Sequence, residues 1–159
     1  PDGIKRALKQ LSREARNTLT IENAEFSWGI DASLELVEHC ALVLDIHHHW
    51  IMTGEYIEPT DPRVQRLWSS WRGVRPVIHY SVSREEHLVD HDTETKPSLT
   101  ELQQLGFTKA KLRAHSDYYW NNACNRWAVS FLPYADIMSE SKQKNLSTPA
   151  LVEQAKNLA

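Results

Sequence analysis

Four side chains with metal-binding groups are spaced along the chain so that each follows a short β-prone segment. These residues are Glu22, Asp45, His79 and Glu140. Carboxylate and imidazole groups without neighbouring thiolates suit a hard or borderline divalent cation, such as Mn²⁺, Mg²⁺ or Zn²⁺. A single acidic residue or histidine at the start of a loop is common, but four at equivalent positions predict a metal site.

The segments that precede these residues have the composition of strands in a parallel sheet. The clearest is 40–45, a nearly continuous apolar run typical of a strand covered on both faces. The predicted strands are residues 19–22, 40–45, 76–80 and 134–139. The predicted helices are residues 4–15, 31–39, 60–71, 98–104 and 112–131 and a C-terminal helix, with Asp31, Thr60 or Asp61, and Ser98 or Thr100 as N-caps. Because parallel neighbours need crossover connections, this alternation predicts an α/β fold.

The alternation also suggests a particular architecture. Four strand–helix units are half of a (β/α)8 TIM barrel, and we expect residues 1–159 to form one such partial barrel domain. An open flavodoxin-like sheet is the competing architecture, but no Gly-rich phosphate loop follows any strand and the chain holds only five glycines. In a barrel the carboxyl ends of the strands share one face, so the four metal-binding side chains are expected to converge there.

The run of three histidines after the second strand leaves two orientations open. Simple strand alternation places His47 beside Asp45, whereas a chain that is already turning points His48 inward. A solvated loop is the other interpretation of this run. The residues alone do not choose between these alternatives.

Other polar residues allow both a functional and a structural interpretation. His115 begins the predicted aromatic helix, where it either binds the metal or caps the helix. His87 and His91 lie four residues apart, but they belong to the polar segment 81–99 and are interpreted as part of a solvated loop. Arg84 and Lys144 follow strand ends, where a phosphate group would meet them, although isolated basic residues are usually solvated.

Composition places the chain among globular proteins and says little about its partners. Of its 159 residues, 41% are hydrophobic and 25% are charged, and a net charge of −3 gives no general basic field. Cys40 and Cys124 form no CxxC pair, which favours reduced thiols. No apolar run is long enough to span a bilayer, so we expect a soluble, cytoplasmic protein with no membrane partner. The start at Pro1, directly before a helix, suggests that an amino-terminal portion precedes these residues.

Several short segments of this sequence resemble the UV damage endonuclease family. They are Ile21-Glu22-Asn23, Asp45-Ile46-His47-His48-His49, His79-Tyr80-Ser81, His115-Ser116-Asp117-Tyr118 and Glu140-Ser141-Lys142-Gln143-Lys144. The resemblance runs nearly from end to end. Members of this family look like metal-dependent (β/α)8 barrels related to endonuclease IV and xylose isomerase, and they nick DNA immediately 5′ to ultraviolet photoproducts.

The resemblance implies a role for each matching residue. The implied metal ligands are Glu22, Asp45, His48, His79, His115 and Glu140, so His48 is favoured over His47. The carboxylates among them would support hydrolysis of a phosphodiester by a cluster of two or three ions, with Mn²⁺ as the expected ion. Asn23 and Asp117 would orient ligands, and Arg84 or Lys144 would contact phosphate. The implied partner is damaged double-stranded DNA, bound at the nucleoid.

Two departures from the family pattern leave other functions open. Val77 stands where the family usually has a lysine two residues before the strand-end histidine. The family's earlier strands, with further histidine ligands, have no counterpart here, so the chain resembles the carboxyl-terminal half of the barrel. The alternatives are a sugar isomerase or epimerase similar to xylose isomerase, and an inactive half-barrel that self-associates or needs its missing half.

Overall fold

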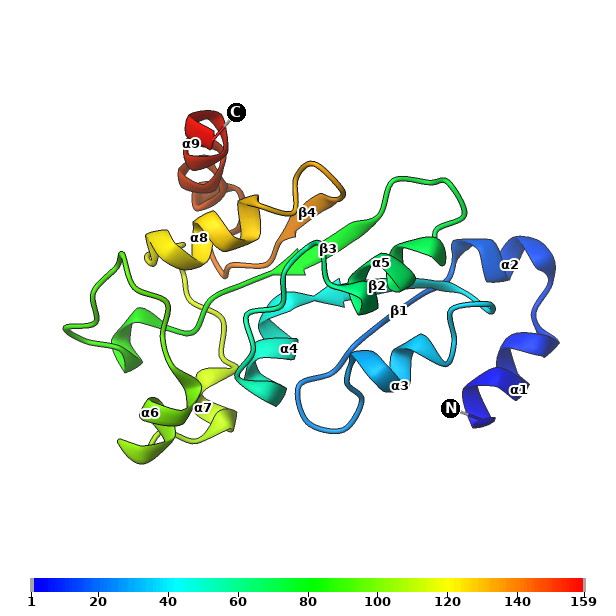
Figure 1. Ribbon diagram of the computed structural model, residues 1–159, viewed down its shortest axis with the longest axis horizontal. Helices are drawn as coiled ribbons and strands as arrows, with labels where there is room; N and C mark the ends of the chain where they lie inside the picture. Colours follow the sequence, from blue (N-terminus) through cyan, green and yellow to red (C-terminus); the bar gives the residue numbers. More distant parts are fainter. Residues whose placement is uncertain (1, 159) are drawn as a thin grey trace.

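The computed structural model describes residues 2–158, in which strands and helices alternate largely as predicted (Figure 1). The strands are β1 (Thr20–Glu22), β2 (Ala41–Asp45), β3 (Val77–Tyr80) and β4 (Asp136–Ser139). The helices are α1 (Asp2–Gln10), α2 (Arg13–Thr18), α3 (Ile30–Leu34), α4 (Ile46–Thr53), α5 (Pro62–Ser69), α6 (Leu99–Gln104), α7 (Lys109–Leu112), α8 (Asn122–Val129) and α9 (Thr148–Leu158), with 3-10 turns η1 (Glu85–His87) and η2 (Lys144–Leu146).

The strands form one parallel sheet in the order β1-β2-β3-β4. Neighbours in the sheet are therefore neighbours in sequence, and all four carboxyl ends lie at the same edge. The register places Asp45 of β2 beside His79 of β3. This confirms the predicted α/β fold with parallel strands, and it is compatible with part of a (β/α)8 barrel.

One face of the sheet carries the core. Leu42, Leu44, Ile78 and Tyr80 are fully buried there, and because register partners point to the same side, these residues share one face. Helices α3 and α5 pack on β2, and the Tyr80 hydroxyl donates to Asn125 Oδ1 of α8 at 2.8 Å. The burial of these apolar side chains is the main force that fixes the strands in register.

The opposite face of the sheet is exposed at its outer strands, whereas Val43 and Asp45 of the inner strand β2 are buried on it. Val77 is half-buried, while Asp136 and Met138 of β4 are exposed, Met138 with 51% of its surface accessible. Thr20, at the start of β1, is exposed on the same side. Within the described residues, then, one face of the sheet is well covered and the other is buried mainly at β2, and the strand-end side chains Asp45 and His79 belong to this second face.

Two of the predicted helices begin or break at other residues than expected. The expected helix 4–15 is broken at Ser12, whose hydroxyl accepts from the Ala15 amide and starts α2 as a separate helix. Asp31 was expected as an N-cap but lies in the first turn of α3, which Gly29 precedes. Asp61 and Ser98 do cap α5 and α6, as predicted.

The predicted aromatic helix 112–131 is much shorter than expected. Only the second half of the predicted helix is helical, as α8. Asn121 is the N-cap of α8, because its side chain accepts from the Cys124 amide. The residues before it do not form a helix because the Tyr119 hydroxyl donates to the carbonyl of Tyr80, the last residue of β3, and Trp120 Nε1 donates to the carbonyl of Ser83. Among residues 2–158, no helix combines the length and the apolarity needed to cross a bilayer.

Candidate metal centre

The carboxyl ends of the four strands bring four metal-binding side chains together. Glu22, Asp45, His79 and Glu140 each offer one ligand atom, and these atoms lie within 4.8 Å of one another. Glu22 and Asp45 end β1 and β2, and His79 is the third residue of β3. Glu140 follows β4, where its amide donates to the Tyr80 carbonyl at 3.0 Å and continues the pairing of β3 with β4. The predicted convergence of these residues is thus present in the structure.

His79 lies between two of the carboxylates. Its Nδ1 donates to Glu22 Oε1 at 2.8 Å and is 3.3 Å from Glu140 Oε1. Burial lowers the pKa of His79, but the hydrogen bond and the charge of Glu22 outweigh it, so the pKa lies above its ordinary value. For Glu22, burial acts in the opposite direction and raises the pKa, but the same contact with His79 brings it below its ordinary value.

Asp45 is the most buried member of the group. Its Oδ1 accepts from the His48 amide at 2.7 Å, whereas Oδ2 is buried without a hydrogen-bond partner among the described residues. Burial raises the pKa of Asp45 well above its ordinary value, and the nearby carboxylates of Glu22 and Glu140 raise it further. A buried carboxylate oxygen without a partner is costly unless a cation meets it. The donor set and this unsatisfied atom therefore fit a divalent metal ion.

Asn23 fixes the backbone of Asp45. Its Oδ1 accepts from the Asp45 amide at 2.8 Å and its Nδ2 donates to the Asp45 carbonyl at 3.0 Å. The side-chain amide thus pairs with both backbone groups of one residue, as a neighbouring strand would. Asn23 is 1% exposed, so water does not compete for these bonds. Its position is consistent with the predicted orienting role.

The three histidines occupy the first turn of α4, which no pattern in the sequence predicted. Asp45 ends β2 and also caps α4, so the chain passes from strand to helix without a loop. Successive helical residues point about 100° apart, so the three rings face different surroundings. His47 is buried and contacts the Ser81 hydroxyl at 2.7 Å, and His49 Nε2 lies 3.1 Å from Glu55 Oε2. The solvated-loop interpretation of this segment is wrong.

His48 is the histidine of this turn that faces the carboxylates. Its Nδ1 is 3.5 Å from Asp45 Oδ2 and 3.7 Å from Glu22 Oε1, and it donates to the Asn23 carbonyl at 2.9 Å. Burial and the neighbouring histidines lower the pKa of His47 to about 3, so that ring stays neutral in the core. The structure therefore distinguishes the two residues that strand alternation left open.

His115 shares one feature with His48. Its Nδ1 donates to the backbone carbonyl of Glu140 at 2.8 Å. A carbonyl only accepts hydrogen bonds, so Nδ1 carries a proton in each ring and the neutral form leaves Nε2 as an acceptor. Metal-binding histidines commonly have this arrangement. His48 and His115 nevertheless lie outside the group of four, and their roles as ligands stay predictions.

The remaining predicted residues lie apart from the four ligands. Arg84 pairs with Glu86 at 2.7 Å, and Asp117 Oδ2 accepts from Gln143 Nε2 at 3.3 Å. Lys144 starts η2 with a φ of 49°. Within residues 2–158, none of these three side chains forms a hydrogen bond or ion pair with the four ligands. Phosphate binding by Arg84 and Lys144, and an orienting role for Asp117, stay predictions.

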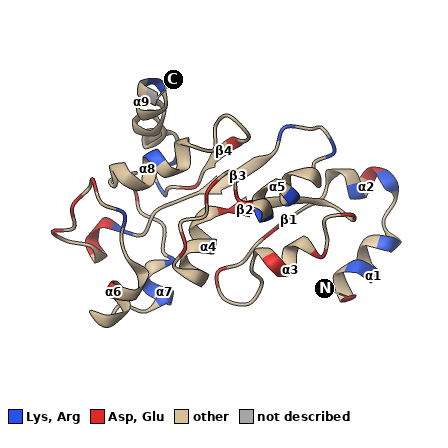
Figure 2. Cartoon of the chain, in the orientation of Figure 1, with Lys and Arg blue, Asp and Glu red and all other residues tan. Residues whose placement is uncertain are grey.

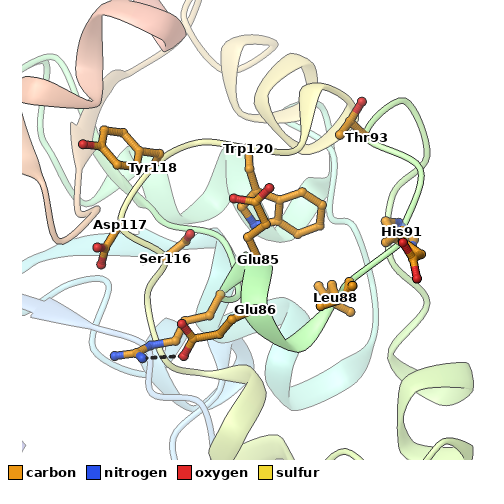
Figure 3. A pocket seen from close by; sticks show the side chains of 12 residues that line it. Glu85, Glu86, Leu88, His91, Thr93, Ser116, Asp117, Tyr118 and Trp120 are labelled. Atoms are coloured by element: carbon orange, nitrogen blue, oxygen red, sulfur yellow. Dashed lines mark hydrogen bonds and ion pairs between the residues drawn. The ribbon is translucent and has the colours of Figure 1, made fainter.

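A cavity of about 510 Å³ lies next to His115 in the chain, between the segments 84–93 and 116–120 (Figure 3). Ser116, Asp117, Tyr118 and Trp120 form one side of it, and Arg84 and acidic residues form the other. Figure 3 shows the Arg84–Glu86 ion pair within this second side. The cavity thus combines aromatic surface with several carboxylates.

Two residues near the site were not predicted from the sequence. Glu25 Oε2 lies 3.9 Å from His48 Nε2, and the Arg113 guanidinium forms an ion pair with the same carboxyl group. Burial raises the pKa of Glu25, but a hydrogen bond from its own backbone and the Arg113 contact leave it below its ordinary value. Glu25 lies in the loop after β1, where an acidic residue carries no distinguishing signal.

Comparisons with known proteins agree with this geometry. The UV-endonuclease UvdE family matches residues 2–159. A protein named UV-damage endonuclease from Schizosaccharomyces pombe is 27% identical over 152 residues, which cover 90% of this chain and 21% of that protein. A second protein of that name, from Neurospora crassa, is 31% identical over 89 residues, covering 49% of this chain and 14% of the relative.

The chain therefore spans about a fifth or less of the length of these relatives. No solved structure matches it. The family match extends over all four strands and over every residue of the strand-end group. The chain thus belongs to the UV-endonuclease UvdE family.

Proposed function

We propose that this chain contributes the metal-binding strands of a DNA repair endonuclease that nicks DNA 5′ to ultraviolet photoproducts by hydrolysing a phosphodiester. The observation that carries the proposal is the convergence of Glu22, Asp45, His79 and Glu140, with the Asp45 Oδ2 atom buried and unsatisfied among the described residues. Family membership supports this choice of substrate, because both relatives are named UV-damage endonuclease.

The chemistry depends on divalent cations, for which Mn²⁺ is the proposed ion and Mg²⁺ and Zn²⁺ are the alternatives. Two or three such ions would lower the pKa of a bound water and offset charge on the phosphate. In this chain, the carboxylates of Glu22, Asp45 and Glu140 would hold the cations and balance their charge. Asn23 would keep Asp45 in place through its two backbone hydrogen bonds.

Histidines would complete the coordination. His79 already lies between two of the carboxylates. His48 and His115 would bind through Nε2, because backbone carbonyls hold their Nδ1 protons. Further ligands would come from other strands of a (β/α)8 barrel, which would pair with the edge strands β1 and β4. Arg84 and Lys144 remain proposed contacts to DNA phosphates.

The direct test is a nicking assay. The protein would be incubated with Mn²⁺ and a labelled duplex that carries one thymine dimer, and in parallel with an undamaged duplex and with a chelator. We expect a nick immediately 5′ to the dimer, and its loss in the Asp45→Ala variant. Asp92→Ala is the matched control, because Asp92 is an exposed aspartate bonded only locally to Glu94 and Thr95 among the described residues. A nick that survives in Asp45→Ala would contradict the proposed site.

The same assay distinguishes the alternatives. A chain that binds Mn²⁺ but leaves the damaged duplex intact would favour the half-barrel that needs its missing strands or a second copy. A sugar isomerase or epimerase would use similar ligands on a polyol, but no contact among residues 2–158 favours that substrate. The relatives' names favour DNA.

A further inference from the structure

His47 is buried in the first turn of α4, and both of its ring nitrogens are engaged. Its Nδ1 lies 2.7 Å from the Ser81 hydroxyl, and its Nε2 lies 3.3 Å from the Ser83 hydroxyl. All three residues are buried, with at most 3% of each exposed, so water does not compete for these contacts. The ring therefore joins α4 to the segment that follows β3.

The direction of each hydrogen bond follows from the contact at the far end. The Ser83 hydroxyl lies 2.6 Å from the Leu112 carbonyl, which only accepts, so its single hydrogen points there. Ser83 Oγ must then accept from His47 Nε2, which carries the ring proton. Because the buried ring is neutral, Nδ1 holds the lone pair and accepts from the Ser81 hydroxyl. Every donor in this series is used, and the bonds run in one direction, from Ser81 to Leu112.

This series of hydrogen bonds ends just before His115 in the sequence. Ser83 pairs with His115 in an antiparallel bridge, and the Ser116 amide donates to the Val82 carbonyl at 2.9 Å. The backbone is thus attached to the segment after β3 on both sides of His115, at Leu112 through a side chain and at Ser116 through the main chain.

The ring of His115 is itself in contact with His47. The two ring centres are 5.9 Å apart and the ring planes meet at 69°, which is an edge-to-face arrangement. On another side, the carbonyl of Glu140 accepts from Nδ1 of His115 at 2.8 Å. These two neighbours set the position and tilt of the His115 ring, and Nε2 is the nitrogen that remains for a ligand.

We propose that His47 is a positioning residue for the metal centre: through Ser83 it fixes the segment that carries His115, so that His115 Nε2 meets the cation without rearrangement. A ligand that is already oriented loses little conformational freedom on binding. Residues that orient a metal ligand commonly contribute roughly 10- to 100-fold to metal affinity. The inference rests on the proposed function, because it takes His115 to be a metal ligand.

The chain contains a matched control for the Ser83 hydroxyl. Ser70 is equally buried, and its hydroxyl likewise donates to a backbone carbonyl, that of Leu67, at 2.6 Å. It also accepts an N–H, from the Leu42 amide at 2.9 Å. Ser70 follows α5, however, and joins it to the amino-terminal part of β2. Alanine at either serine removes the same kinds of contact, but only Ser83 is joined to His47.

The first experiment measures Mn²⁺ binding by isothermal titration calorimetry, with urea denaturation to verify folding. We expect Ser83→Ala to lower the affinity by roughly tenfold. Ser70→Ala should leave the affinity unchanged, although both variants should lose stability to a similar extent. In a His115→Ala background, Ser83→Ala should cause no further loss of affinity, because its effect is transmitted through His115. A general loss of stability would not depend on His115 in this way.

Two substitutions of His47 itself identify the bond that matters. Glutamine keeps a donor near the position of Nε2 and still reaches Ser83, whereas the shorter asparagine side chain reaches only Ser81. We therefore expect His47→Gln to retain most of the Mn²⁺ affinity and His47→Asn to lose as much as Ser83→Ala. Equal losses in the two variants would overturn the part assigned to the Ser83 bond.

The outcomes separate this inference from the proposed function. If wild type binds Mn²⁺ and Ser83→Ala binds it equally tightly, the positioning role is overturned while the metal centre stands. The same holds if Ser83→Ala loses as much affinity in the His115→Ala background as it does alone, or if His115→Ala has no effect. If wild type binds no Mn²⁺, the strand-end metal centre itself fails, and with it this inference.

Discussion

Two regions of the molecule are rich in carboxylates and histidines, but they differ in how those groups are arranged. The strand-end group combines side chains from the ends of four strands. The acidic loop, residues 84–94, takes its charges from one continuous stretch between β3 and α6, and Figure 2 shows its acidic segments in red at the edge of the molecule. Among the described residues, the His91 ring forms a hydrogen bond with the Thr95 carbonyl at 2.9 Å and lies edge-on to the Trp120 ring.

The acidic loop satisfies its charges locally. Asp92 accepts from the Glu94 amide and from the Thr95 hydroxyl, and Glu94 pairs with Arg126 at 2.7 Å. A backbone hydrogen bond lowers the pKa of Asp92, whereas burial raises that of Asp45. The difference shows that residue type alone does not make a metal site. What distinguishes the strand-end group is a buried, convergent charge that the described residues leave unsatisfied.

The largest expected effect is on metal affinity. Replacing Asp45 by asparagine removes a central carboxylate, so we expect the affinity for Mn²⁺ to fall by about 100-fold or more, beyond what loss of a supporting residue causes. Asp92→Asn, the same change in the acidic loop, should leave the affinity unchanged. Isothermal titration calorimetry of both variants would measure this, and equal losses would remove the distinction between the two regions.

A smaller effect of the same substitution concerns stability without metal. In chelator, Asp45→Asn should raise the free energy of unfolding by about 2 kcal/mol, because it removes a buried charge while asparagine still caps α4. The folded-state pKa of Asp45 is raised, so the folded protein resists ionisation that the unfolded chain accepts. Wild type therefore loses stability as the pH rises above the ordinary carboxyl range.

Urea denaturation at pH 5 and pH 8, in chelator, would measure this difference. The advantage of Asp45→Asn over wild type should be larger at pH 8. A variant that is less stable than wild type at both pH values would show that the Asp45 charge is not a burden to the folded protein.

The smallest expected effect concerns Asn23. Alanine at this position removes both hydrogen bonds to the Asp45 backbone, and water can enter the space it leaves, so Asn23→Ala should destabilise the metal-free protein by about 1.5 kcal/mol. Asn157→Ala, in an exposed part of α9, serves as the control and should change stability little. Thermal unfolding would compare them, and equal stability of both variants would mean that the pairing contributes nothing.

The strands and the strand-end group were predictable because each depends on a local pattern. A buried parallel strand such as β2 is an apolar run that ends in a polar residue, and parallel topology then places all such ends together. Glu22, Asp45, His79 and Glu140 follow from this rule. The family resemblance added His48 and His115, whose ligand roles the structure leaves as predictions.

The rest depended on contacts that no local pattern contains. Helix α4 was missed because Asp45 is both a strand residue and a helix cap, and three successive histidines carry no amphipathic period. The aromatic helix was overextended because Trp120 and Tyr119 are held by carbonyls distant in sequence. Glu25 was missed because its position beside the His48 ring depends on contacts between residues that are distant in sequence.

The pairing of Asn23 with Asp45 also has a consequence for how ions would bind. Strand β1 is only three residues long, yet the Asn23 side chain extends its ladder by one step while the main chain is free to turn toward α3. Asp45 is thereby rigid before any cation arrives, so little conformational entropy is lost when one does. The rate of metal capture should then be set by dehydration of the ion rather than by rearrangement of the protein.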